Sequence, residues 1–338
     1  MHLIFQILFI LIAITAIALF TKNVKRIARN IKLGQDEKIN DRSGERRKNV
    51  LLLAFGQKKM FRNPLVAVLH LFVYVGFVII NIEVLEIILD GIAGVHRIFS
   101  PAGFVYIFLI NAFEILALLV LASCVIFFIR RNIVKVKRLS GHDLDGFPRS
   151  DANYILLTEI VLMSLFLIMN CCDTILQQRG FGEYGKTITG NFTVSHFLQP
   201  AFNGLENNTL EIIERTCWWL HIVGIFAFLN YLPYSKHLHI LLAFPNAYYA
   251  TLLPKGEMKN MPDIQKEVLY AMQPEFAPAT TDEATSAHKK FGAKDVLDLS
   301  WKNLLDAYSC TECGRCTASC PANITGKILS PRKIMMQT

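Results

Sequence analysis

Residues 65–89 read LVAVLHLFVYVGFVIINIEVLEIIL, a run whose ionisable side chains other than tyrosine are His70, Glu83 and Glu86. At about 1.5 Å of rise per residue, a helix of this length crosses the roughly 30 Å of hydrocarbon in a bilayer. Four further apolar runs span residues 3–20, 104–129, 155–176 and 217–242. Of the 338 residues 53% are hydrophobic, and this excess lies in the five runs. The sequence therefore predicts an all-α membrane protein with a five-helix transmembrane bundle over residues 1–245.

Lysine and arginine are distributed unevenly between the connecting segments. Residues 21–63 hold thirteen and residues 130–151 hold six, whereas residues 91–100 hold one and residues 177–216 hold three. Basic loops remain on the cytoplasmic side of a membrane. We therefore expect a multi-pass inner-membrane protein with its N-terminus outside and its basic loops and C-terminal segment in the cytoplasm. The net charge of +8 then reflects topology, and no nucleic-acid partner is expected.

The N-terminal apolar run and the segments after the bundle also have interpretable compositions. The basic residues of the first run follow it rather than precede it, which favours an uncleaved anchor over a signal peptide. Residues 246–295 are rich in proline and charged residues and predict a cytoplasmic tether. A short amphipathic helix near residues 296–308 should follow, and we assign residues 296–338 to an α-helical, ferredoxin-type domain.

Four of the eight cysteines fall within residues 310–321, which read CTECGRCTASCP. The spacing C-x2-C-x2-C-x3-C-P is that of a ferredoxin run holding a [4Fe–4S] cluster, whereas zinc sites usually pair two separated C-x2-C knuckles. Gly314 should let the backbone approach the sulfurs. The predicted cluster ligands are Cys310, Cys313, Cys316 and Cys320. The other four cysteines lie in or beside the spans and are predicted to be apolar packing residues.

The last cysteine of such a run binds a different cluster in two-cluster ferredoxins. A second cysteine run does not follow before Thr338. Either the natural protein continues with a second cluster, or a partner supplies the missing ligand. Both alternatives remain open, and the ferredoxin-type domain is expected to be incomplete at its C-terminal end.

Histidines near one depth of the bundle suggest a haem. His70 lies close to the cytoplasmic start of the second span and His239 at the cytoplasmic end of the fifth, so their imidazoles can clamp a b-type haem between two helices. His221 precedes His239 by 18 residues. On one continuous helix this spacing is five turns, or about 27 Å, which places His221 near the outer surface. His237 is expected to point elsewhere, because neighbours two apart do not share a helix face.

Residues 221–239 read HIVGIFAFLNYLPYSKHLH and resemble the fifth helix of the gamma subunit of respiratory nitrate reductase, a cytochrome b. That family binds two b haems through two histidines on helix two and two on helix five. His70, His221 and His239 match three of these four positions. The resemblance therefore implies a haem held by His70 and His239.

An outer haem on His221 lacks its usual partner, because Ile80 stands where the fourth histidine of that family is found. His96 and His196, both in predicted outer loops, are the candidate substitutes. The number of haems, one or two, stays open at this point.

Residues 306–323 read DAYSCTECGRCTASCPAN and residues 329–333 read LSPRK. Both stretches resemble the membrane iron–sulfur oxidoreductases related to heterodisulfide reductase, some of which oxidise electron-transfer flavoprotein and reduce quinone. Together the two resemblances cover about residues 60–338. They imply electron transfer in the bilayer between membrane quinone and a cytoplasmic flavoprotein or iron–sulfur catalytic subunit. Those relatives carry a second ferredoxin run, so we assign no terminal catalytic centre to this chain.

Four carboxyl groups fall within the predicted spans, and intramembrane ionisable groups mark functional sites by default. Quinone chemistry needs protons, and Glu114 is the deepest of the four, so we predict it as the catalytic, proton-relaying carboxylate. Glu83 and Glu86 are placed near the outer interface and Glu159 near the inner one, where a structural role is the alternative.

Two other functions are weighed against quinone-linked electron transfer. A redox sensor or regulatory subunit of a membrane complex would use the cluster without quinone turnover. A transporter or channel is disfavoured, because the five spans show no even internal repeat and the histidines have no role there.

Overall fold

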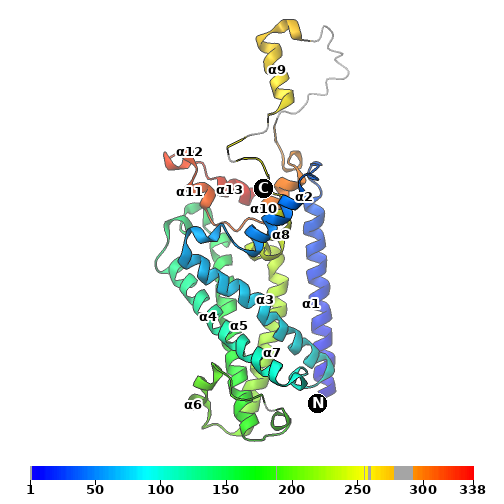
Figure 1. The fold of residues 1–338 in the computed structure, drawn as a ribbon, viewed down its shortest axis with the longest axis vertical. Coiled ribbons are helices and arrows are strands. Elements are labelled where there is room, and N and C mark those ends of the chain that lie inside the picture. The colour runs from blue at the N-terminus through cyan, green and yellow to red at the C-terminus, as the bar shows by residue number, and fades with distance from the viewer. Residues whose placement is uncertain (1, 188, 255, 258–259, 278–291) are drawn as a thin grey trace.

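The computed structural model describes residues 2–187, 189–254, 256–257, 260–277 and 292–338. Five long helices lie side by side in one elongated bundle (Figure 1). They are α1 (His2–Ile31), α3 (Pro64–Ala93), α4 (Phe104–Asn132), α5 (Phe147–Gln178) and α7 (Asn207–Tyr231). All five are long and apolar enough to cross a membrane, and the described residues form no β-strand. The predicted helical architecture with five apolar helices is confirmed.

Local sequence signals set the starts of the long helices. The Asn63 side chain accepts a hydrogen bond from the Val66 amide at 3.4 Å, and Pro64 takes the first helical position of α3. A proline there has no amide hydrogen to leave unpaired. The helix α5 also has a proline in its first turn, Pro148, but its N-cap residue Gly146 provides no side-chain cap.

The long helices pack pairwise through a shared apolar core. The most extensive contacts are those of α5 with α7, α3 with α4 and α4 with α5, whereas α1 lies at one side of the bundle against α7 and α3 (Figure 1). Gly76 permits the close approach of α3 and α4, because a Cβ there would lie 2.4 Å from Cγ2 of Val120. The four cysteines of the spans are buried in the core, as predicted; they are Cys124, Cys171, Cys172 and Cys217.

The segments connecting the helices place the basic residues at one end of the bundle. The segments 21–63 and 130–151 both lie at the end where the C-terminal residues are found (Figure 1), which we call the basic end. The N-terminus and α6 (Gln199–Phe202) lie at the opposite end. Shorter helices at or beyond the basic end are α2 (Ser43–Asn49), α8 (His239–Tyr248), α9 (Pro262–Met272), α10 (Trp301–Tyr308), α11 (Arg315–Ala318), α12 (Pro321–Ile324) and α13 (Pro331–Gln337).

The fifth span begins and ends earlier in the chain than the predicted run of residues 217–242, because α7 already starts at Asn207. The helix α7 ends at Tyr231, because Pro233 cannot donate the next helical hydrogen bond. Two 3₁₀ turns, Leu232–Tyr234 and Lys236–Leu238, follow before α8 begins at His239. His221 and His239 therefore do not lie on one continuous helix, and the five-turn separation expected between them is wrong.

The cysteine-containing segment is docked on the basic end. Part of the predicted tether, residues 255, 258–259 and 278–291, lies outside the described residues, and the described part includes α9. The helix expected near residues 296–308 is a 3₁₀ turn (Val296–Asp298) followed by α10. A backbone bridge joins Gln35 to Ser300, and Trp301 Nε1 donates to the Glu37 carbonyl at 2.9 Å. These contacts attach α10 to the segment that leaves α1.

Candidate functional site

Two predicted haem ligands meet at the basic end of the bundle. The ring centroids of His70, on α3, and His239, the first residue of α8, lie 6.5 Å apart with 43° between the ring planes. His70 Nδ1 lies 2.9 Å from Gln57 Oε1, and His239 Nδ1 lies 3.0 Å from the Lys236 carbonyl oxygen. Both acceptors favour the tautomer with a proton on Nδ1, as second-shell partners of metal-bound histidines do. Each Nε2 is then free to bind an iron.

The separation of these two rings suits two imidazoles on opposite sides of one metal ion. A metal–imidazole bond of about 2 Å, added to the two half-rings, puts the centroids roughly 6 Å apart. Burial lowers the pKa of His239, which lies beyond the last spanning residue. The ring is therefore neutral near neutral pH, which is the form that binds iron.

A third imidazole, His237, lies beside this pair. Its ring centroid is 5.6 Å from that of His239, and its buried Nε2 has no hydrogen-bond partner among the described residues. Burial lowers the pKa of His237 to about 3. The expectation that His237 points elsewhere is wrong, because Lys236–Leu238 is a 3₁₀ turn rather than part of a regular α-helix. The buried Nε2 of His237 could pair with a polar group of a cofactor bound beside it.

His221 lies apart from the pair, in the core of the bundle. Its side chain is 1% exposed, its Nδ1 lies 3.0 Å from the Leu162 carbonyl oxygen, and its ring packs against Phe166. Neither candidate partner is brought to it. His96 contacts Asp173 and lies edge-on against the Tyr184 ring, and His196 is an exposed residue beside Phe197.

The four predicted cluster ligands lie on one compact stretch that starts directly after α10. The Glu312 amide donates to Cys310 Sγ at 3.4 Å, and both Glu312 and Gly314 have positive φ angles, so the backbone curls around the first sulfur. Burial raises the pKa of the Cys310 thiol. Across the part of the chain that the structure describes, no three His, Cys, Asp or Glu side chains are grouped as a metal site. The assignment of the cysteines as cluster ligands therefore stays a prediction.

Lys236 connects the histidine pair to the cysteine stretch. Its carbonyl accepts the His239 hydrogen bond, while its ammonium forms an ion pair with Glu312 and donates to the Pro148 carbonyl at 2.6 Å. The turn that carries Lys236 is held by Asp151, which accepts from the Ser235 hydroxyl at 2.6 Å. The role of Lys236 was not predicted from the sequence. Its place in the short segment between Pro233 and His239 was the signal that could have indicated it.

Arg332 anchors the last helix of the chain to the bundle. Its guanidinium donates to both carboxylate oxygens of Asp143, at 2.8 and 2.5 Å, and to the Arg138 carbonyl at 2.7 Å. A Cβ on Gly314 would lie 2.6 Å from Arg332 Nη1. In this structure, glycine at position 314 leaves room for Arg332, a reason different from the expected approach of backbone to sulfur.

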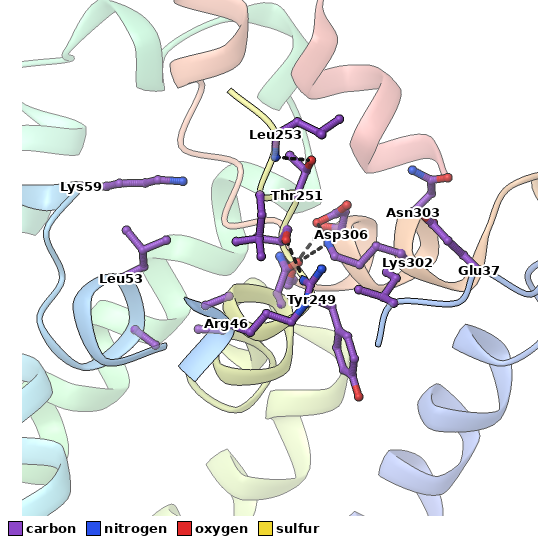
Figure 2. Close-up of a pocket in the computed structure, with 18 of the residues that line it drawn as sticks. Glu37, Arg46, Leu53, Lys59, Tyr249, Thr251, Leu253, Lys302, Asn303 and Asp306 are labelled. Atoms are coloured by element: carbon purple, nitrogen blue, oxygen red, sulfur yellow. Dashed lines mark hydrogen bonds and ion pairs between the residues drawn. The ribbon is translucent and has the colours of Figure 1, made fainter. Parts of the chain in front are cut away.

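A cavity of about 640 Å³ lies at the basic end, lined by residues of α2, α8 and α10 and of the segments beside them (Figure 2). His239 lines one side, and Thr311, from the cysteine stretch, lines another. The guanidinium of Arg46 supports its wall by donating to the Tyr248 and Ala250 carbonyls at 3.1 and 3.0 Å. Arg46 also pairs with Asp41 and lowers the pKa of that carboxyl to about 2.

Glu114, the predicted proton relay, is fully buried toward the opposite end of the bundle. One oxygen accepts from the Val194 and Ser195 amides at 2.8 and 3.1 Å, and the other accepts from the Ser195 hydroxyl and from Asn170 Nδ2. These contacts attach the loop between α5 and α7 to α4. Such a role is structural, and a proton-relaying role for Glu114 stays a prediction.

A buried polar network beside Glu114 was not foreseen. The guanidinium of Arg97 donates to Asp173 at 2.6 Å, to the Tyr106 hydroxyl at 2.9 Å and to Asn170 at 2.9 Å. Asp90 accepts from the Arg97 amide at 2.8 Å, which fixes the turn after α3. The available signal was Arg97 itself, the single lysine or arginine in residues 91–100, a loop that follows several carboxylates.

Comparisons with known proteins find two relatives that match most of this chain. It is 28% identical to a probable iron–sulfur-binding oxidoreductase, FadF, of Bacillus subtilis over 330 residues, which are 98% of this chain and 42% of that protein. It is 25% identical to the EtfAB:quinone oxidoreductase of Syntrophomonas wolfei over 308 residues, which are 88% of this chain and 38% of that protein. These similarities support an iron–sulfur oxidoreductase.

A shorter match falls on part of the chain. A probable membrane-anchored ferredoxin of Chromohalobacter salexigens is 39% identical over 49 residues, which are 14% of this chain and 7% of that protein. No protein-family profile and no solved structure matches the chain. The chain spans about two fifths of the length of the first two relatives.

Proposed function

We propose that this chain transfers electrons between a redox partner at its basic end and quinone in the membrane. In this proposal His70 and His239 hold a b-type haem, and the four cysteines of residues 310–320 hold a [4Fe–4S] cluster. When bound, the two groups supply one-electron carriers. The observation that supports the proposal best is the 6.5 Å separation of the two imidazole rings, each with its Nδ1 already engaged.

The chain's own residues would fix the two sites relative to each other. Gln57 and the Lys236 carbonyl orient the imidazoles, and the Lys236–Glu312 ion pair attaches the cysteine stretch beside them. A redox sensor would not need this connection to the histidine pair, so the connection favours electron transfer over the sensor alternative.

The proposed partners follow from the chain's position in a bilayer and from its relatives. Basic loops are retained in the cytoplasm, so we place the basic end and the cysteines on the cytoplasmic side of an inner membrane. The relative named EtfAB:quinone oxidoreductase suggests an electron-transferring flavoprotein as the donor or acceptor there. A reporter fused after Thr338 should be active only as a cytoplasmic fusion; export of that reporter would reverse the orientation.

An optical difference spectrum tests the function. Membranes that contain the protein, reduced with dithionite and compared with the oxidised state, should show the narrow α-band of a b haem. A quinol should reduce part of that band, which a sensor without quinone turnover would not allow. A preparation without a b-haem band refutes the proposed carrier, and a band that responds to dithionite alone removes the link to quinone.

A further inference from the structure

A second cavity, of about 370 Å³, lies toward the end of the bundle that is opposite the basic end. It lies between α3, α4 and the turn that joins them. Its walls are mainly apolar, from Phe99, Leu109 and Phe113, and its polar members are Glu83, Glu86 and Tyr106. Cavities of about 300–1,000 Å³ with apolar walls and a few polar groups are typical small-molecule sites.

One carboxyl in this cavity is unsatisfied. Glu83 is 3% exposed, and its buried Oε2 has no hydrogen-bond partner among the residues the structure describes. The neighbouring Glu86 is different, because its two oxygens accept from the Phe99 amide and the Tyr106 hydroxyl, both at 2.9 Å. A buried polar atom without a hydrogen-bond partner destabilises the fold, so a carboxyl that is retained in this state points to a ligand that pairs with it.

The edge of the cavity faces the surface that a bilayer would cover. Ile82 on α3 is 43% exposed and Ile98 in the connecting turn is 38% exposed, and both line the opening. A molecule with a polar ring and a long apolar tail can place the ring against Glu83 and let the tail leave between these side chains into lipid.

We propose that this cavity binds the ring of a membrane quinone or quinol, with Glu83 as its hydrogen-bond partner. The inference rests on the proposed function, and it assigns the quinone to a specific place in the fold. A quinol hydroxyl can donate to Oε2 of the ionised carboxylate, and a quinone carbonyl can accept from the same oxygen when it is protonated. Glu83 can therefore form a hydrogen bond with either redox form of the ring, and the inference concerns where the ring binds.

Photolabelling combined with a binding measurement tests this site. An azidoquinone photolabel on the full chain in membranes should mark peptides from α3, α4 or the turn between them. Glu83→Leu removes a carboxyl whose buried Oε2 has no hydrogen-bond partner among the described residues, so it should fold normally and weaken quenching-detected binding of heptyl-hydroxyquinoline N-oxide about tenfold or more. The matched control is Glu159→Leu, a carboxyl removed from α5, which should leave binding unchanged.

A second variant keeps the test independent of Glu83. Ala102 is exposed at the cavity edge, so Ala102→Trp should block entry while leaving the core intact. The inference is overturned when Glu83→Leu and Ala102→Trp both bind as well as the unaltered chain, or when the label marks other segments. It is also overturned when phosphatidylglycerol displaces the label as effectively as quinol, because the cavity then holds an acyl chain. Loss of the b-haem band would refute the proposed carrier and leave these binding results standing.

Discussion

Lys236 and Glu312 form an ion pair that joins the turn after the fifth span to the cysteine stretch. The Lys236 side chain is 11% exposed and that of Glu312 is 17% exposed, so the pair is largely removed from water. The carbonyl of Lys236 accepts the hydrogen bond that orients His239. Lys236 therefore contacts the histidine pair through its backbone and the cysteine stretch through its side chain. A substitution of the side chain should disturb the second contact and leave the first in place.

Lys236→Gln should loosen the cysteine stretch without displacing the histidines. The substitution removes the charge that pairs with Glu312 but keeps the backbone carbonyl bound by His239. Truncating one partner of a largely buried pair costs about 3–5 kcal/mol at most, and less with the exposure seen here. Hydrogen exchange at residues 310–320 should therefore accelerate at least severalfold. Lys186→Gln, in an exposed pair with Glu183, is the control and should change nothing.

The contact between Arg332 and Asp143 should make the docking of the last helix pH-dependent. The guanidinium lowers the pKa of the Asp143 carboxyl below its ordinary value. A carboxyl with a lowered pKa stabilises the docked state fully above its ordinary pKa of about 4, and this contribution is lost as pH falls through the lowered value. Proteolysis near residues 325–338, by a protease active in acid, should rise below about pH 4. Asp143→Asn should show the faster cleavage already at neutral pH, and equal cleavage at every pH would contradict the assignment.

Cys313→Ser should remove the paramagnetic signal of a reduced [4Fe–4S] cluster and leave the haem spectrum unchanged. The two predicted sites use residues on separate segments, so losing one cluster ligand does not disturb the histidines. Electron paramagnetic resonance and the iron and sulfide content of the purified protein provide the measurement. Cys171→Ser, which changes a buried packing residue, is the control. Wild-type iron and sulfide in Cys313→Ser would show that this cysteine is not a ligand.

The five-helix architecture could be predicted from the sequence because a chain segment inside hydrocarbon must satisfy its own backbone hydrogen bonds. Long apolar runs must be helices that satisfy their own backbone, so the five helices were predictable from residue composition alone. The end of the fifth helix at Tyr231 was not predicted, because the apolar run was taken as one helix. Pro233, which cannot continue a helix, was the sequence signal for this end. That error moved His237 away from His239 in the prediction.

The parts that could not be predicted depend on contacts between distant segments. Arg332 meets Asp143 across 189 positions, and Trp301 meets Glu37 across 264. No period or spacing in the sequence reports such pairs, and the predicted tether gives no indication of where the cysteine segment docks. The unpartnered oxygen of Glu83 is likewise visible only once α4 and the turn at Phe99 pack around α3.

His70→Ala and His239→Ala should each remove most of the bound b haem. A haem with two histidine ligands has no spare protein ligand, so the loss of either imidazole releases it. His221 lies elsewhere in the core, with its ring against Phe166, and is not a member of the pair. His221→Ala should therefore keep the haem band in full with one haem, and lose about half of it when a second haem binds there. Reduced-minus-oxidised spectra of membranes, normalised to inserted protein by immunoblot, provide the measurement.

Gln57→Ala separates ligand loss from loss of ligand orientation. Gln57 Oε1 lies 2.9 Å from His70 Nδ1, so this variant keeps both imidazoles and removes only the group that fixes one ring. Losing such a partner typically weakens metal binding about 10- to 100-fold. The b-haem band should therefore persist in Gln57→Ala but be lost at lower concentrations of a haem-binding competitor. Full haem retention by His239→Ala would refute the pair and leave His237, whose buried Nε2 is unpartnered among the described residues, as the alternative ligand on that side.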